Sequence, residues 1–189
     1  KNIPIKAGLG GGSMNAASIL SYFVKKKFIK IDKKKIAEIS KLIGSDVILG
    51  IHPTHSILTN KNEIKRFYNY KKLYTLICKP NFGCSTNDIY SSVRSFKTSK
   101  LSHPNKKMFN LNFLKKMDNS LEPIAFSKHP KLKKIKLYLD GFCNPIFVRM
   151  SGSGSALVAY FQSKERCDYA KKQFNRKYKN YWCIASKTI

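Results

Sequence analysis

Acidic residues and arginines are scarce in this chain. Its 189 residues include 10 Asp and Glu against 37 Lys and Arg, which gives a net charge of +27. Arginine supplies 5 of the 37 basic residues. Because the planar arginine fork suits bidentate recognition of phosphates and bases, a lysine-rich charge argues against a dedicated nucleic-acid reader. We interpret most of the charge as a solvated surface that attracts anionic substrates at long range.

Long apolar runs and paired cysteine motifs are also missing. The chain has no stretch of eighteen apolar residues that would span a membrane, and its start lacks the apolar region of a signal peptide. Its five cysteines are odd in number and never in C-x-x-C spacing, so we expect reduced thiols in a cytoplasmic protein. Since the first residue is not Met, we expect the chain to be part of a longer protein.

Alternating helix and strand patterns predict an α+β fold. A helix is expected at 13–27 with Ser13 as its N-cap, and a second helix should follow the cap Asp32 and end at a left-handed Gly44. Further strands are expected at 55–59, 73–78, 147–150, 156–161 and 181–186, and helices at 88–93, 111–117, 131–139 and 163–178. A change in composition near 69–72 predicts two domains, 1–71 and 72–189.

The stretch 7–17, AGLGGGSMNAA, places a glycine-rich backbone directly before the first helix. Glycines let a ligand approach the backbone, and a helix N-terminus offers unpaired N–H groups, so the stretch predicts a phosphate cradle. A tight loop without a ligand is the alternative. The spacing does not match the P-loop, which needs Lys where Met14 stands, nor the dinucleotide fingerprint, which needs a third glycine where Ser13 stands.

Several stretches together resemble the GHMP kinases, the family of galactokinase, homoserine kinase and mevalonate kinase. They are KNIPIKAGLGGGSMNAASIL at 1–20, GSDVILG at 44–50, PNFGCSTNDIY at 80–90, DNSLEP at 118–123 and RMSGSGSALVAYF at 149–161. The triple glycine followed by Ser-x-Asn-Ala-Ala is most similar to the branch whose substrate is a cytidine diphosphate-linked methylerythritol, in non-mevalonate isoprenoid synthesis. The resemblance covers nearly the whole chain.

The resemblance implies a fold, an ATP-dependent kinase activity and a set of site residues. The fold would be α+β, with a partial ribosomal-protein-like nucleotide domain and a ferredoxin-like C-terminal domain. ATP and Mg²⁺ would be bound, with no side chain assigned to the metal, and Asp46 would be catalytic. Thr86 and Tyr90 would contact the substrate. The residues implied for ATP binding are Gly8, Gly10, Gly11, Gly12, Ser13, Asn15, Gly152, Ser153 and Gly154.

Other interpretations stay open at this point. From spacing alone, Asp46 could cap the turn at 47–50, Tyr90 could be a core aromatic, and the segment 151–155 could be a simple turn between strands. The chain could belong to a homoserine or mevalonate type of kinase, or to a basic RNA-binding protein. We take the segment 118–123 as structural. Because a full-length kinase of the resembling family carries more chain, we expect these 189 residues alone to be inactive.

Overall fold

The computed structural model describes residues 3–59, 63–68, 72–95 and 104–189, which form two compact units. The first unit contains 3–9, 72–95 and 105–188, and the second contains 10–59, 63–68, 104 and 189. The predicted domain boundary falls within 69–71, outside the described residues, and remains a prediction. The segment 3–9 packs with the first unit, although it precedes the second in the chain.

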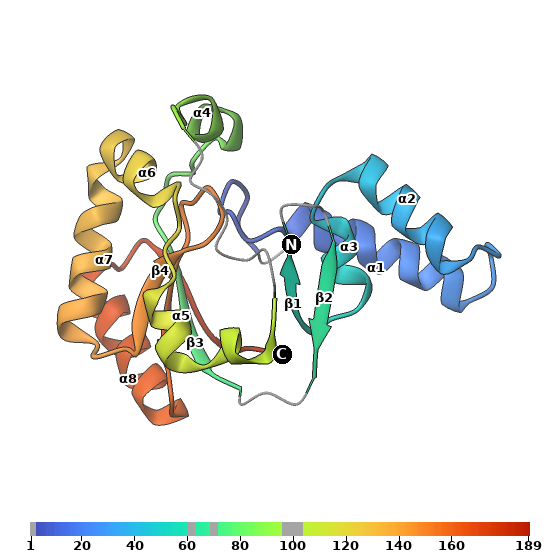
Figure 1. Cartoon of the computed structure of the whole chain (residues 1–189). Helices are drawn as coiled ribbons and strands as arrows, with labels where there is room; N and C mark the ends of the chain where they lie inside the picture. Colours follow the sequence, from blue (N-terminus) through green and yellow to red (C-terminus); the bar gives the residue numbers. More distant parts are fainter. Residues whose placement is uncertain (1–2, 60–62, 69–71, 96–103) are drawn as a thin grey trace. The chain divides into compact units, whose positions relative to one another are not determined.

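A four-stranded antiparallel sheet forms the frame of the first unit (Figure 1). The strands are β3 (Tyr74–Lys79), β4 (Phe147–Met150), β5 (Leu157–Phe161) and β6 (Trp182–Lys187), in the spatial order β4-β5-β3-β6. Two crossover connections separate β3 from β4 and β5 from β6. This order and these crossovers make the split βαβ arrangement of a ferredoxin-like fold.

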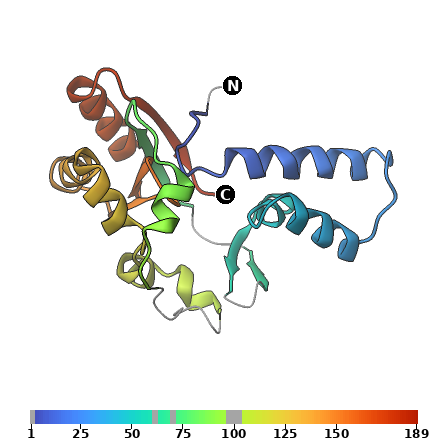
Figure 2. The same ribbon diagram turned by 90° about the horizontal axis from the view of Figure 1, so that it is seen from above.

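Helices cover one face of this sheet (Figure 2). The helix α7 (Pro130–Phe142) packs on β4 and β5, and α8 (Lys164–Lys177) packs on β3, β5 and β6. Their apolar stripes meet alternate strand residues in the core, including Leu132, Leu139, Phe174, Leu76, Leu157 and Phe161. The remaining helical elements are α4 (Thr86–Ser91), a 3₁₀ turn (Lys106–Phe109), α5 (Leu111–Lys116) and α6 (Glu122–Lys128).

The second unit is mainly helical. It contains α1 (Gly11–Lys25), α2 (Lys33–Ile43), α3 (Val47–Ile51) and the antiparallel pair β1 (His55–Leu58) and β2 (Ile64–Phe67). Gly50 lets α3 approach α1 closely, because a Cβ there would lie 2.7 Å from the Cβ of Ala17. Within the described ranges, none of the helices combines the length and hydrophobicity needed to cross a bilayer.

The structure confirms most predicted elements and corrects several local details. Asp32 caps α2 as predicted, since its carboxylate accepts a hydrogen bond from the Lys35 N–H at 2.7 Å. Ser13 is not an N-cap, because α1 begins at Gly11 on a left-handed Gly10 with φ 63°. Gly44 has φ 168° and is extended, not left-handed. The strand β2 was not predicted, because its four residues, IKRF, show little alternation of apolar and polar side chains.

Candidate functional site

Gly8 belongs to the first unit, where the two glycine-rich segments of the chain meet. The Ser151 hydroxyl donates to the Gly8 carbonyl at 2.8 Å across 143 residues of sequence, and the Ala156 N–H donates to the Ala7 carbonyl at 3.0 Å. Gly8 has φ +70°, and a Cβ on it would lie 2.2 Å from the Ser151 carbonyl oxygen. Both the conformation and the space therefore require glycine at this position.

The start of α1 lies in the second unit and presents backbone N–H groups. The first intrahelical bond runs from the Met14 N–H to the Gly10 carbonyl at 2.9 Å. The N–H groups of Gly11, Gly12 and Ser13 precede that bond and so lack an intrahelical acceptor. Asn15, on the same first turns, is exposed. This arrangement suits an anion, and the phosphate cradle at the glycine stretch stays a prediction.

Gly12 differs from Gly8 and Gly10 of the same stretch. It has helical backbone in α1, and a Cβ added to it would meet no described atom within 4 Å. Gly10, by contrast, has φ +63° and needs glycine for its conformation. Glycine inside a helix costs up to about 1 kcal/mol relative to alanine. Neither packing nor backbone conformation within the described chain therefore accounts for glycine at position 12.

The turn between β4 and β5 carries the second glycine motif of the first unit. Gly152 and Gly154 have φ +51° and +86°. Ser153 is buried at 4% exposure, and its hydroxyl lies 3.0 Å from the Thr86 hydroxyl. The structure thus brings together a residue predicted for the nucleotide and one predicted for the substrate.

The helix α4 places Thr86 and Tyr90 on one side of the first unit. Ser85 caps the helix by accepting a hydrogen bond from the Asp88 N–H. Thr86 and Tyr90 are four residues apart and therefore share a helix face. Tyr90 is 50% exposed, which excludes the alternative of a core aromatic. Its ring is available to stack on a planar ligand.

Asp46 stands at the N-cap position of α3 in the second unit, but its side chain makes no capping hydrogen bond. Among the described residues, the hydrogen bond found for its carboxylate comes from the Ser45 hydroxyl at 3.5 Å. The carboxylate is exposed. The alternative that Asp46 serves as a cap for the turn is therefore wrong.

Lys79 lies in the first unit, in a polar network with Phe82 and Ser155. It was not among the predicted site residues. Its ammonium donates to the carbonyls of Pro80 and Phe82, at 2.9 Å each, and the Ser155 hydroxyl donates to the Phe82 carbonyl at 2.8 Å. Burial lowers the pKa of Lys79 below its usual 10.5. A lysine that ends the apolar strand LYTLICK was the sequence signal for a buried, hydrogen-bonded cation.

Each unit holds its own set of the predicted residues. The first contains Gly8, Thr86, Tyr90, Gly152, Ser153 and Gly154, and the second contains Gly10, Gly11, Gly12, Ser13, Asn15 and Asp46. No group of three or more His, Cys, Asp or Glu that could hold a metal ion occurs in the part of the chain that the structure describes.

Comparison with known proteins identifies the family. Residues 1–54 match the model of the GHMP kinases N terminal domain. The 4-diphosphocytidyl-2-C-methyl-D-erythritol kinase of Pelagibacter ubique is 56% identical over 189 residues, which are 100% of this chain and 67% of that protein. The kinase of the same name from Clostridium tetani is 31% identical over 198 residues, covering 100% of this chain and 69% of its own length.

Solved structures agree on the fold. A crystal structure of 4-(cytidine 5'-diphospho)-2C-methyl-D-erythritol kinase matches with TM-score 0.76 and 23% identity, covering 100% of this chain and 69% of that one. Homoserine kinase from Cytophaga hutchinsonii matches with TM-score 0.75 and 15% identity, covering 100% and 68%. These similarities confirm the GHMP kinase fold, and the sequence identities select the branch. The chain therefore belongs to the 4-diphosphocytidyl-2-C-methyl-D-erythritol kinases, within the GHMP kinase family.

Proposed function

We propose that the protein containing this chain transfers the γ-phosphoryl group of ATP to the 2-hydroxyl of 4-diphosphocytidyl-2-C-methyl-D-erythritol, in the synthesis of isoprenoid precursors. Family membership supports the reaction. The observation in the structure that supports it best is the glycine-rich start of α1, where the N–H groups of Gly11, Gly12 and Ser13 precede the first intrahelical bond. Open space beside Gly12 leaves room for a ligand to approach this backbone.

The start of α1 fits the phosphates of ATP. Three backbone N–H groups without intrahelical acceptors and the positive end of a 15-residue helix favour an anion. The loop residues Gly152, Ser153 and Gly154 are proposed as further contacts to the nucleotide. The net charge of +27 also attracts an anionic substrate at long range.

The donor set also fits Mg²⁺ that is bound chiefly through phosphates and water. Ser13 and Asn15 offer neutral oxygens, and Asp46 offers an exposed carboxylate in the same unit. The described residues form no cage of several carboxylates, and Mg²⁺ commonly takes one or two carboxylates with phosphate and water ligands. When bound, the ion neutralises charge on the phosphate oxygens.

Asp46 is proposed to orient the acceptor hydroxyl and accept its proton. Phosphoryl transfer needs positioning and charge stabilisation more than covalent help, so an exposed carboxylate without a capping role suits this task. Thr86 is proposed to contact the methylerythritol part. Tyr90, at 50% exposure, is proposed to stack on the cytosine ring.

Two glycine variants test the role of the glycine stretch. Gly12→Ala should strengthen helix α1 while placing a methyl group where the phosphates approach. Gly141→Ala is the matched control, because Gly141 also lies in a helix and its added Cβ also meets no described atom within 4 Å. Both variants should keep or slightly raise the free energy of unfolding, by up to about 1 kcal/mol.

The expected difference is in ATP affinity. Gly12→Ala should raise the Kd for ATP at least about tenfold, which corresponds to roughly 1.4 kcal/mol, and Gly141→Ala should leave it unchanged. Equal ATP affinity in both variants would contradict the proposed contact between Gly12 and the nucleotide.

Turnover tests the reaction itself, with the complete gene product that contains this chain. ADP release would be followed with ATP, Mg²⁺ and the cytidine-linked substrate, for the native protein and Asp46→Asn. The Asn variant should lower kcat about 10²- to 10⁴-fold with little change in the KM for ATP. Turnover with homoserine or mevalonate, and none with the cytidine-linked compound, would replace the proposed substrate.

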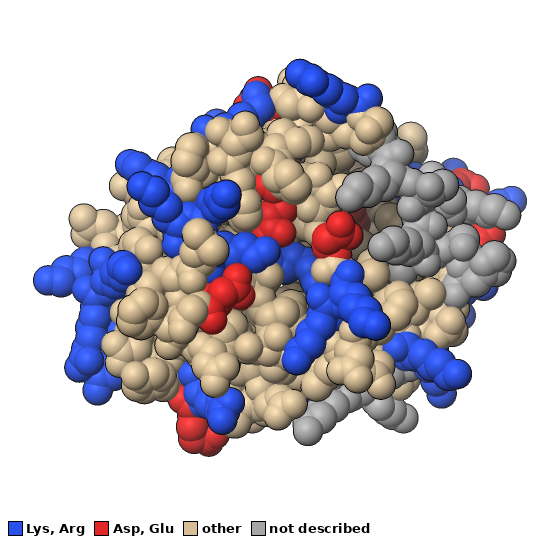
Figure 3. Space-filling model, turned by 60° about the vertical axis from the view of Figure 1, so that its left-hand side comes forward, with Lys and Arg blue, Asp and Glu red and all other residues tan. Residues whose placement is uncertain are grey.

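A function in RNA binding has less support. On the face drawn in Figure 3, Lys and Arg side chains form several separate groups with Asp and Glu between them. An RNA reader is expected to gather arginine and aromatic residues in one patch. The salt dependence of RNA retention would separate a nonspecific electrostatic contact from a specific one, since the former weakens steeply with salt for all sequences.

A further inference from the structure

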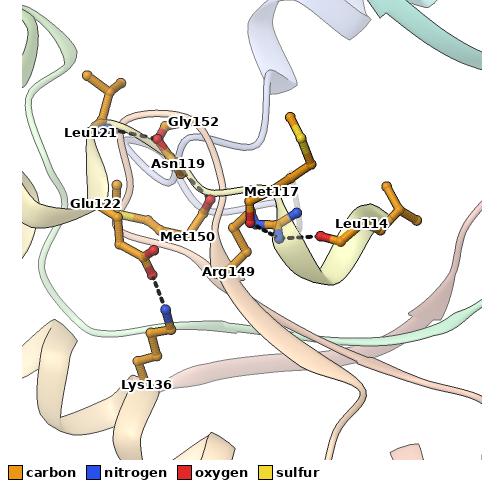
Figure 4. Close-up of polar contacts among 9 residues, drawn as sticks. All are labelled: Leu114, Met117, Asn119, Leu121, Glu122, Lys136, Arg149, Met150 and Gly152. Carbon is orange, nitrogen blue, oxygen red and sulfur yellow. Dashed lines mark hydrogen bonds and ion pairs between the residues drawn. The ribbon is translucent and has the colours of Figure 1, made fainter. Parts of the chain in front are cut away.

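Asn119 lies in the connection between α5 and α6, and its side-chain amide makes three hydrogen bonds (Figure 4). The Nδ2 group donates to the carbonyl of Met150 at 2.9 Å and to the carbonyl of Gly152 at 2.7 Å. The Oδ1 atom accepts from the Leu121 N–H at 3.0 Å. Two carbonyls meet the donor end and one N–H meets the acceptor end, so the pattern allows one orientation of the amide.

The two carbonyls belong to the segment that enters the glycine turn. Met150 ends β4, and Gly152 is the first glycine of the turn that leads to β5. Both are more than thirty residues from Asn119 in the sequence, so the bonds tie the turn to a distant part of the first unit. The turn is also tied to Gly8 through the Ser151 hydroxyl.

Fixing the Gly152 carbonyl also fixes the direction of the next N–H group. A trans peptide is planar, with its C=O and N–H pointing to opposite sides. Because the Gly152 carbonyl points at Asn119, the N–H of Ser153 is directed to the opposite side of that peptide. Ser153 is also held through its hydroxyl, 3.0 Å from that of Thr86. The turn thus holds a backbone donor in a set direction before any ligand arrives.

We propose that Asn119 is a positioning residue for phosphoryl transfer, which aims the backbone of the turn 151–155 at the nucleotide. This proposal rests on the proposed kinase function and adds a residue that touches no reacting atom. A preorganised donor stabilises charge better than one that must reorient on binding, because no reorganisation is needed at the moment of reaction. Loss of the tether should therefore weaken ATP binding and turnover in addition to any effect on the fold.

Asn119→Asp separates the two tasks of this side chain. The aspartate keeps an oxygen that can accept from the Leu121 N–H near the start of α6, where a negative charge is also favoured. It loses the Nδ2 donor and turns a carboxylate towards two carbonyl oxygens. Asn119→Ala removes both tasks.

Arg149→Gln is the structural control from the same region. The Arg149 guanidinium donates to the carbonyls of Leu114 and Met117 and so anchors the end of α5, but its bonds do not reach the glycine turn (Figure 4). A purely structural role for Asn119 would make Asn119→Asp resemble Arg149→Gln, with lower thermal stability and unchanged ATP affinity.

The measurements are the Kd for ATP, the thermal midpoint, and kcat and KM of the complete gene product. We expect Asn119→Asp to lower the thermal midpoint, because the fold loses two hydrogen bonds. Because the turn is then no longer held in its direction, the Kd for ATP should also rise, by about tenfold or more. Asn119→Ala should show the same loss of affinity with a lower midpoint. Arg149→Gln should lower the midpoint alone.

The outcomes distinguish this proposal from the proposed function. Native-like Kd, kcat and KM in Asn119→Asp, in a protein that phosphorylates the cytidine-linked substrate, would overturn the positioning role and leave the function intact. A protein that binds ATP but phosphorylates another acceptor would overturn the substrate, while the Kd comparison still decides the role of Asn119. A native protein that binds no ATP would overturn both.

Discussion

Replacing Gly8 by alanine tests the contact between the two glycine-rich segments of the first unit. The backbone of Gly8 has φ +70°, a conformation that costs an alanine about 1–2 kcal/mol. The new Cβ would also lie 2.2 Å from the Ser151 carbonyl oxygen and 2.9 Å from the Gly154 nitrogen. Both atoms are backbone atoms, so relief requires the turn to move rather than a side chain to rotate.

The expected loss of stability follows from these two terms. Overpacking of this kind costs about 1–3 kcal/mol, so the total should be roughly 2–5 kcal/mol. Gly10→Ala is the matched control, because Gly10 has φ +63° but its added Cβ meets no described atom within 4 Å. It should carry the conformational cost alone, about 1–2 kcal/mol.

Urea unfolding of the 189-residue chain, followed by the fluorescence of its single tryptophan, is a suitable assay. Trp182 lies in β6 and reports on the first unit, which contains Gly8, and far-UV circular dichroism follows the helices of the second unit, which contains Gly10. The midpoint for Gly8→Ala should fall well below that for Gly10→Ala, with an unchanged slope. Equal midpoints for the two variants would refute the close packing of residues 6–8 against the turn 151–154.

Three further predictions concern the first unit. Lys136→Met should lower the free energy of unfolding in urea by about 2 kcal/mol, because Glu122, 8% exposed, loses its ion-pair partner at 3.0 Å. Adding Glu122→Gln should recover part of this stability, and no recovery would refute the pairing. Burial raises the pKa of the Cys143 thiol from 9.0 to about 11. Because the folded state favours the protonated thiol, this group stabilises the fold by an amount of order 2 kcal/mol below pH 9, and that stabilisation is lost as the pH rises to 11. The stabilities of the native chain and Cys143→Ala should therefore converge between pH 9 and 11, and parallel curves would contradict this. Tyr90→Ala should raise the KM for the cytidine-linked substrate about 10- to 100-fold in the ADP-release assay with little effect on unfolding, whereas Tyr90→Phe should stay near native; equal KM values would argue against stacking.

Local features of the fold were predictable from the sequence because they depend on neighbours in the chain. The cap Asp32 lies three residues before its Lys35 N–H partner, and the apolar strand β3 shows in the run LYTLIC. The glycine stretch predicted a phosphate site for the same reason, since glycines and a helix start are adjacent there. The family was predicted from short motifs, and the comparisons confirm the family. The roles of the individual site residues remain proposals.

The tertiary structure determines which of these local features contact one another. The sequence does not show that the Gly8 carbonyl meets Ser151, or that Asn119 reaches Met150 and Gly152, since these partners are 143, 31 and 33 residues apart. It also does not distinguish Gly8, required by packing, from Gly12, at which no described atom requires glycine. A residue's preference for a helix, strand or turn depends on its neighbours in the sequence. The space around its Cβ and the partners of its carbonyl depend on distant segments that folding brings beside it.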